Sequence, residues 1–262
     1  MLRFKNLGSG STGNATLVEA SGIRSTRLLV DCGLGIKQLA LRLADAACSE
    51  AASLDAIFIT HEHSDHIGCV RQFAQRYRIP VWMSRGTYEA LGSPDFDGLL
   101  HIATDGQAID LGELQVTPFT VPHDAREPLQ LTCTDGNAKL GVLTDLGHAT
   151  AHVLTHLAGC HALLLECNHD TDLLEKSSYP TFLKRRVGGP YGHLSNTAAA
   201  AIASALAHPG LKHVVAAHLS AQNNSPNLAL EALSRSHAPQ WGSPEFSAAH
   251  PTDGSLWMQV SA

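Results

Sequence analysis

The first third of the chain alternates between short apolar runs and polar turns. Residues 2–7 alternate apolar and polar positions, which is the period of a strand, and short apolar runs follow. These patterns predict strands over 2–7, 15–20, 27–31, 54–60 and 80–84. Ile36, Leu39 and Leu43 recur at helical spacing and predict a helix over 36–47. The same spacing predicts helices over 66–78 and 85–91.

The rest of the chain repeats this mixture of strands and helices. Apolar runs predict strands over 114–121, 129–134, 139–144, 161–166, 211–217 and 256–260. Asp135-Gly136 lies between two of these runs and predicts a hairpin. Helices are predicted over 195–207, with Ser195 or Asn196 as the N-cap, and over 226–236. Residues 92–113 combine turn signals with short strands. No low-complexity linker divides the chain, so we predict a single α/β domain over residues 1–262, with two sheets packed face to face and helices outside.

Composition narrows the class of protein. The chain has 262 residues, of which 44% are hydrophobic, and a net charge of -6. That charge argues against a surface coated in cations for non-specific nucleic-acid binding, although bound metal ions supply local positive charge that a net charge ignores. The 6 cysteines form no CxxC pair, and no signal peptide or membrane-length apolar run is present. These features predict reduced thiols and a cytoplasmic protein without a membrane partner.

Metal-ligand residue types directly follow several predicted strands. Ile59-Thr60 leads into His61, Leu143-Thr144 into Asp145, and Ala216-Ala217 into His218. Val121-Pro122 leads into His123 in the same way. Residues at strand ends are held by a rigid sheet at an edge that a substrate can reach. The pattern therefore predicts one site built from several strand ends.

The most specific motif is His61-Glu62-His63-Ser64-Asp65-His66. Two imidazoles two residues apart can hold one ion, and the following Asp-His pair can turn toward a second. A structural zinc site would more often contain cysteines, which are absent from this stretch, so the motif indicates a catalytic centre. The competing interpretation, a surface loop rich in histidine, leaves the ligand types at the other strand ends unexplained.

This motif resembles that of the metallo-β-lactamase superfamily, whose fold would span the whole chain. The resemblance implies a four-layer αββα sandwich with two mixed sheets. It implies two divalent metal ions, zinc or manganese with iron as a further possibility. His61, His63 and His123 would bind the first ion, while Asp65, His66 and His218 would bind the second. Asp145 would bridge the two ions.

Further stretches are similar to the YycJ/WalJ-like branch of that superfamily. They are Gly8 to Asn14, Thr144-Asp145-Leu146-Gly147, Glu166-Cys167-Asn168-His169-Asp170, Gly192-His193-Leu194-Ser195-Asn196 and Ala217-His218-Leu219-Ser220. Cys167 departs from the pattern, which has a small residue such as serine there. That branch resembles metal-dependent DNA exonucleases, so the likeness implies a nucleic-acid substrate, DNA rather than RNA. The inserted arm of ribonuclease Z and the cap of β-CASP nucleases have no counterpart in the sequence.

The resemblance also suggests individual roles. A metal-bridging hydroxide would attack phosphorus, Asp145 and Asp65 would hold and orient it, and His193 would protonate the leaving oxygen. Asp31 would support the histidine loop or cap a turn. The residues expected to contact substrate are Ser9, Asn14, Asn168, His169 and Asn196, with the run Lys184-Arg185-Arg186 either contacting phosphates or forming a solvated helix face.

Three functions remain open on the sequence. The first is a phosphodiesterase acting as a 5′-to-3′ DNA exonuclease. The second is a small-molecule hydrolase of the same dimetal type, acting on a cyclic phosphodiester or on a thioester as glyoxalase II-like members do. The third is a metal-binding scaffold without catalysis. A thiolate leaves without a proton donor, so His193 favours the phosphodiester, and a complete ligand set disfavours the scaffold. The sequence leaves the oligomeric state open.

Overall fold

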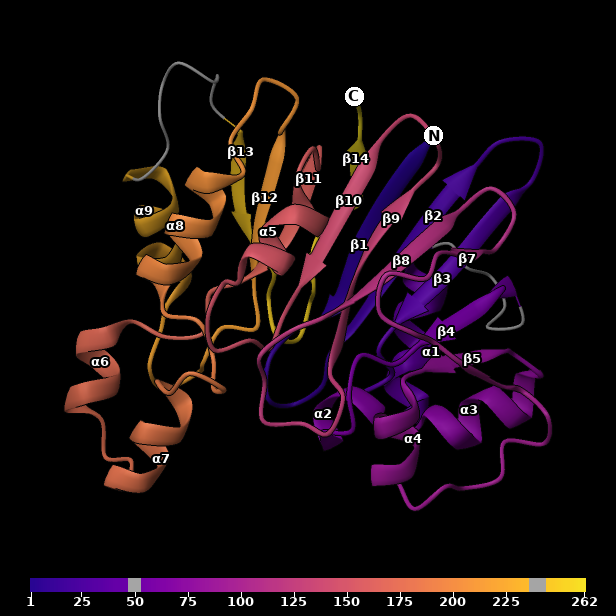
Figure 1. Ribbon diagram of the computed structural model, residues 1–262, viewed down its shortest axis with the longest axis horizontal. Coiled ribbons are helices and arrows are strands. Elements are labelled where there is room, and N and C mark those ends of the chain that lie inside the picture. The colour runs from indigo at the N-terminus through magenta and orange to yellow at the C-terminus, as the bar shows by residue number, and fades with distance from the viewer. Residues whose placement is uncertain (47–52, 236–243) are drawn as a thin grey trace.

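Two mixed sheets form the centre of the computed structural model, which describes residues 1–46, 53–235 and 244–262 (Figure 1). The first sheet has the order β14-β1-β2-β3-β4-β5-β6 and the second the order β13-β12-β11-β10-β9-β8-β7. The first sheet consists of β1 (Leu2–Gly8), β2 (Ala15–Ser21), β3 (Ser25–Val30), β4 (Ala56–Phe58), β5 (Val81–Met83), β6 (Leu100–Ile102) and β14 (Met258–Val260). The second consists of β7 (Ile109–Asp110), β8 (Gln115–Thr120), β9 (Leu129–Thr134), β10 (Lys139–Leu143), β11 (Ala162–Glu166), β12 (His213–Ala217) and β13 (Glu245–Ala248).

Each sheet is antiparallel on one side and parallel on the other. Strands β1 to β3 pair antiparallel, whereas β3 to β6 pair parallel. Strands β7 to β10 pair antiparallel, whereas β10 to β13 pair parallel. The hairpin predicted at Asp135-Gly136 is confirmed, because Thr134 pairs with Lys139 across it. The two halves of the chain therefore repeat one topology, which their sequences do not reveal.

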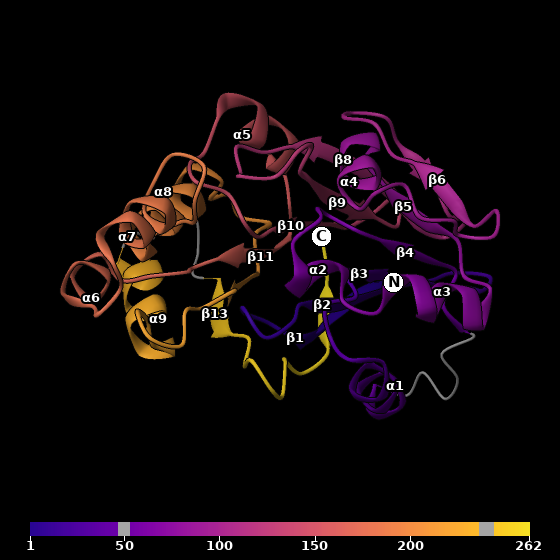
Figure 2. The same ribbon diagram turned by 90° about the horizontal axis from the view of Figure 1, so that it is seen from below.

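Helices cover the outer face of each sheet (Figure 2). The helices of the described chain are α1 (Ile36–Asp45), α2 (Ser64–Ile67), α3 (Val70–Tyr77), α4 (Arg85–Ala90), α5 (Ala151–Leu157), α6 (Thr171–Lys176), α7 (Thr181–Val187), α8 (Asn196–Ala205) and α9 (Pro226–Arg235), and α2, α6 and α7 lie beyond the sheet faces. Phe4, Phe58 and Val142 belong to a core between the sheets. A second core lies under α5, α8 and α9, and a third lies under α1 and α3. The predicted four-layer αββα sandwich is confirmed.

The prediction of one helix over 66–78 is wrong, because two helices, α2 and α3, occupy this stretch. Gly68 separates α2 from α3 with a φ of 32°. A side chain at this position would meet the carbonyl oxygen of Cys32 at 2.4 Å, so the chain passes too close to the 32–33 turn for a continuous helix. Helix α2 begins at Ser64 and ends before Gly68, so Asp65 and His66 lie in its only turn.

Several elements were not predicted. Helices α6 and α7 and strand β13 lie where no element was expected, and α5 was likewise missed. Helix α7 has no buried residue, so it has no apolar stripe for periodicity to detect. The predicted ends Ala47 and Ser236, together with Cys48, lie outside the described residues. Over the described ranges, no helix combines the length and the apolar character needed to cross a bilayer.

Glu19 is a buried carboxylate in the middle of β2, where it joins two neighbouring strands. Arg27 Nε lies 2.6 Å and Arg3 Nη2 2.5 Å from its carboxylate oxygens. Burial opposes ionisation of Glu19, but these two guanidinium groups outweigh it and lower the pKa of the carboxyl group below its ordinary value. A lowered pKa stabilises the fold above the unfolded pKa, and this stabilisation is lost as pH falls through the folded pKa.

We therefore expect Glu19→Gln to lower the free energy of unfolding by about 2 kcal/mol at pH 7. The difference from wild type should shrink once the pH falls below about 4. Urea unfolding at several pH values measures it. Glu231→Gln is the matched control, because Glu231 pairs with Arg235 on the exposed face of α9 and should change little. A difference that is independent of pH would contradict the expectation.

Candidate metal centre

The predicted ligands gather at the edge where the parallel strands of both sheets end. Thr60 and His61 follow β4, Asp145 follows β10, and His218 follows β12. Parallel neighbours end at the same edge, so β10, β11 and β12 deliver their next residues side by side. Asp31, Asp145 and His218 have φ values of 62°, 56° and 54°. This left-handed backbone costs free energy for a residue other than glycine, and such strain clusters at functional sites.

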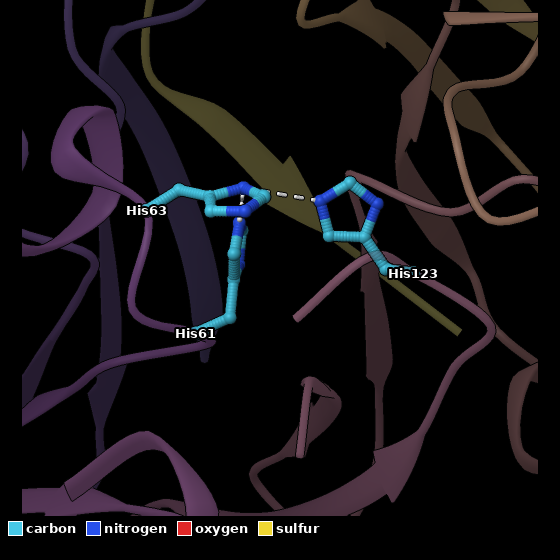
Figure 3. Close-up of side chains that lie close together, drawn as sticks. All are labelled: His61, His63 and His123. Carbon is cyan, nitrogen blue, oxygen red and sulfur yellow. Dashed lines mark hydrogen bonds between the residues drawn. The ribbon is translucent and has the colours of Figure 1, made fainter. Parts of the chain in front are cut away.

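Three histidine rings form the first half of the centre (Figure 3). His63 Nδ1 lies 3.1 Å from His61 Nε2 and 3.3 Å from His123 Nε2. The ring nitrogen of His123 that faces away from this group, Nδ1, donates to the carbonyl oxygen of Gly192 at 3.0 Å. The proton of His123 is therefore on Nδ1, and the lone pair of Nε2 points at the other two rings.

Asp65, His66 and His218 form the second half. His66 Nε2 lies 3.7 Å and His218 Nε2 3.5 Å from Asp65 Oδ2. Asp145 lies between the two halves, since its carboxylate comes within 4.8 Å of ligand atoms of both His61 and His66. His66 Nε2 is 3.0 Å from Asp145 Oδ2, and that oxygen is buried without a hydrogen bond. The structure thus brings together every residue predicted as a metal ligand.

The donor chemistry of this group fits divalent cations. The lone pairs of several imidazoles and two carboxylates converge, and electron-rich atoms held this close repel one another unless a cation lies among them. Burial lowers the pKa of His61 and of His123, which keeps both rings neutral as ligands must be. No cysteine contributes, so imidazole nitrogen and carboxylate oxygen would be the ligands, a set that zinc, manganese and iron all accept.

At the two carboxylates, neighbouring histidines outweigh the effect of burial on the pKa. Burial opposes ionisation of Asp145, yet His218 and His66 hold its pKa well below the ordinary value. Burial is likewise outweighed at Asp65, whose pKa falls to about 2 through His218 and His66. Burial would lower the pKa of His218, but these carboxylates outweigh that effect and raise the pKa to about 9. An incoming cation would displace such protons, so its affinity should increase with pH.

Asp31 supports the rings of two candidate ligands, His61 and His66, on the side away from the centre. Its Oδ2 accepts from His66 Nδ1 at 2.8 Å. The Thr60 hydroxyl donates to Asp31 Oδ1 at 3.0 Å and therefore accepts from His61 Nδ1 at 2.9 Å. One carboxylate thus fixes the tautomers of His61 and His66 and turns both Nε2 atoms inward. The supporting role, rather than a turn cap alone, fits these contacts.

We expect Asp31→Asn to weaken metal affinity by about 10- to 100-fold, the usual effect of losing such a partner. Asparagine tolerates the left-handed backbone of Asp31, so the substitution changes charge with little strain. Metal competition against a chromophoric chelator measures the affinity. Asp97→Asn is a matched control, because Asp97 is exposed with a φ of 54°. Equal affinities in the two variants would contradict the supporting role.

A buried glutamate that the sequence reasoning missed holds His193 in place. Glu166 Oε1 accepts from His193 Nδ1 at 2.7 Å and lies 3.2 Å from His218 Nδ1. The pKa of Glu166 falls to about 2, because His193 outweighs the effect of burial. Burial would lower the pKa of His193, but Glu166 and Asp145 raise it well above the ordinary value. These two carboxylates therefore favour the protonated form of His193, next to the candidate metal ligands.

A cavity of about 340 Å³ opens onto this group. Its lining includes Asp65, Asp145, Asn168, Arg186, His193 and His218. Of the residues predicted to contact substrate, Asn168 lines this cavity, although its Nδ2 also donates to the carbonyl oxygen of His218. His193 lines it as expected.

The other predicted substrate contacts lie elsewhere. Ser9 is buried, and its hydroxyl accepts from the backbone N–H of His218 at 2.6 Å. Asn14 is buried and closes the glycine-rich loop through Gly10 while contacting Asp65. Asn196 pairs with Asn224 and faces a different cavity, between α8 and α9. His169 is buried with Nδ1 unpaired. Ser9 and Asn14 thus contact the candidate ligands His218 and Asp65, and the structure does not bring Asn196 or His169 into the cavity.

Comparison with known proteins gives a consistent result. Residues 26–219 match the family model described as the beta-lactamase superfamily domain. The chain is 34% identical over 238 residues to the exodeoxyribonuclease YycJ of Bacillus anthracis, covering 89% of this chain and 88% of the relative. It is 32% identical over 232 residues to the exodeoxyribonuclease WalJ of Streptococcus pneumoniae, covering 87% of this chain and 85% of that protein. The metallo-beta-lactamase fold protein YhfI of Bacillus subtilis superposes with a TM-score of 0.74 at 18% identity, over 99% of this chain and all of YhfI.

Proposed function

The chain belongs to the metallo-β-lactamase superfamily and is a hydrolase of that superfamily, and on this premise we propose that it cleaves phosphodiester bonds in DNA, releasing nucleotides from a 5′ end. The observation that carries the proposal is the contact of 2.7 Å between His193 and Glu166 beside Asp145. An alkoxide is a poor leaving group that needs a proton, and a positioned imidazolium supplies one. A thiolate needs none, so this arrangement favours phosphodiesters over thioesters.

The proposed ligand assignment follows the two halves of the site. His61, His63 and His123 would hold one divalent ion, while Asp65, His66 and His218 would hold the other, with Asp145 shared. When bound, such ions lower the pKa of water and neutralise charge that develops on the phosphoryl group. Zinc or manganese, with iron as a further possibility, would fill these positions.

The other steps belong to side chains of this protein. Glu166 accepts from His193 Nδ1 and leaves Nε2 as the proton donor to the departing 3′ oxygen. The carboxylate of Asp65, 3.5 Å from His218, lies on the cavity wall, where it would orient the attacking water. The cavity itself, at about 340 Å³, accommodates a terminal nucleotide but not a duplex.

The relatives named above support DNA as the substrate, because both are exodeoxyribonucleases by name and match over most of their length. The test is a nuclease assay with linear 5′-phosphorylated duplex DNA, labelled at either end, and with manganese or zinc. Stepwise loss of the 5′ label before the 3′ label is expected, and the Asp145→Asn protein should release neither. Metal-dependent hydrolysis of a thioester or of a cyclic phosphodiester with no release from DNA would replace this substrate.

A further inference from the structure

One segment of the molecule adds almost nothing to the hydrophobic cores. Residues 171–192, hereafter the arm, comprise α6, α7 and the loop to Gly192, and they project from the body at the end where α2 lies (Figure 1). Helix α7 has no buried residue, and α6 buries Leu174 alone. A helix of this length is not stable in isolation. Since α7 lies outside the hydrophobic cores of the described chain, its place in the structure points to a role at the surface.

The arm exposes large aromatic side chains. Phe182 on α7 is 73% exposed, and Tyr191 in the following loop is 60% exposed. Tyr191 is two residues from His193, so the Cα atoms of the two residues lie within about 7.6 Å of each other. Tyr179, at the other end of α7, lines the cavity. Two large exposed aromatic side chains on the segment that also supplies Tyr179 to the cavity are consistent with a binding surface.

The same helix concentrates positive charge in a protein whose net charge is -6. Lys184, Arg185 and Arg186 follow one another on α7, which carries no acidic residue. Arg186 lines the cavity and pairs with Asp124 at 2.6 Å. Within the described part of the chain, the side chain of Arg185 forms no hydrogen bond or ion pair, and the residue is exposed. Its charge is therefore available to an outside anion.

We propose that the arm is the docking surface for an unpaired nucleic-acid strand, with bases stacking on Phe182 and Tyr191 and a backbone phosphate on Arg185. Aromatic platforms interleaved with cations are what single-strand binding requires, since every base has a face to stack and every linkage a charge. The strand would run along α7 into the cavity and present its terminal linkage beside His193. This inference rests on the proposed function, because it names how that substrate reaches the site.

The arm can be separated from the chemistry by a double variant. Phe182→Ala with Arg185→Ala removes one stacking platform and one phosphate contact, and neither residue lines the cavity. Tyr191 is left intact because its loop carries His193. Ile23→Ala with Arg24→Ala is the matched control, since Ile23 is fully exposed and Arg24 is exposed beside it in the β2–β3 turn. That turn lies at the opposite end of the molecule from the arm (Figure 1).

Binding is measured by fluorescence anisotropy with the manganese-loaded protein and a single-stranded, 5′-phosphorylated oligonucleotide whose phosphorothioate linkages resist cleavage. The arm variant should bind at least about tenfold more weakly than wild type and show a shallower salt dependence, while the control binds normally. Both variants should hydrolyse bis(p-nitrophenyl) phosphate at the wild-type rate, because that substrate is too small to reach the arm.

Wild-type affinity in the arm variant would overturn the inference. So would a wild-type protein that fails to bind the strand. If wild type is a dimer, the arm variant a monomer and strand affinity unchanged, the surface belongs to a second copy of the chain and the inference is wrong. A strand bound through the arm but not cleaved when its linkages are natural phosphodiesters would uphold the arm and refute the proposed reaction.

Discussion

The Asp145→Asn protein should lose at least about 10³-fold of its hydrolytic rate while remaining folded. Among the described residues, Asp145 is the carboxylate that comes within 4.8 Å of ligand atoms in both halves of the centre, and its Oδ2 is buried without a hydrogen bond. Replacing the carboxylate by an amide removes a negative charge from the point where several imidazoles and a second carboxylate converge. Several kcal/mol of charge stabilisation depend on correctly held ions, which corresponds to the predicted loss in rate.

Asparagine is the right replacement because Asp145 has a φ of 56°, a backbone conformation that asparagine adopts more readily than alanine does. The rate and the bound metal per chain should be measured together, the latter by atomic emission. The Asp97→Asn protein, which makes the same chemical change at an exposed left-handed position, should keep both. Full activity with a full complement of metal in Asp145→Asn would exclude Asp145 as a shared ligand.

The strand ends explain why so much of the centre could be located from sequence. An apolar run followed at once by His or Asp is visible as a pattern, and it identified His61, His123, Asp145 and His218. Parallel pairing of β10, β11 and β12 then places their ends together without any further information. Successive residues of a strand point to opposite faces, so an unbroken apolar run predicts a strand between two cores. Leu28 and Leu29 illustrate this, because they belong to different cores.

What the sequence did not reveal depends on contacts between distant segments. Glu166 ends the buried strand β11, and in the sequence it looks like an ordinary residue at the end of a strand. In the structure it contacts His193, which lies in a loop 27 residues further along the chain. Ser9 and Asn14 are of a type that binds phosphates in loops, but tertiary contacts direct them to His218 and Asp65 instead. Asn196 does not line the cavity at the centre, because its position on α8 places it in a different cavity, between α8 and α9. Only the folded geometry separates a side chain that supports a ligand from one that meets substrate.

The His193→Ala protein should lose about 10²- to 10⁴-fold in rate on DNA and much less on a substrate with a good leaving group. Hydrolysis of p-nitrophenyl thymidine 5′-phosphate expels a stable phenolate that needs no proton, so its rate should fall by about tenfold at most. A residue that merely supported the fold or held the metal would affect both substrates equally. The ratio of the two losses therefore identifies a proton donor, and His213→Ala, at the opposite end of β12 from His218, is the matched control.

The pH profile gives an independent test of the same role. Glu166 and Asp145 raise the pKa of His193 against the effect of burial, which favours its imidazolium form. The wild-type rate on DNA should hold through neutral pH and decrease as the pH rises through that raised pKa, because the proton is then absent. His193→Ala should lack this alkaline decrease. If the variant keeps the same alkaline limb, another group supplies the proton and His193 only supports Glu166.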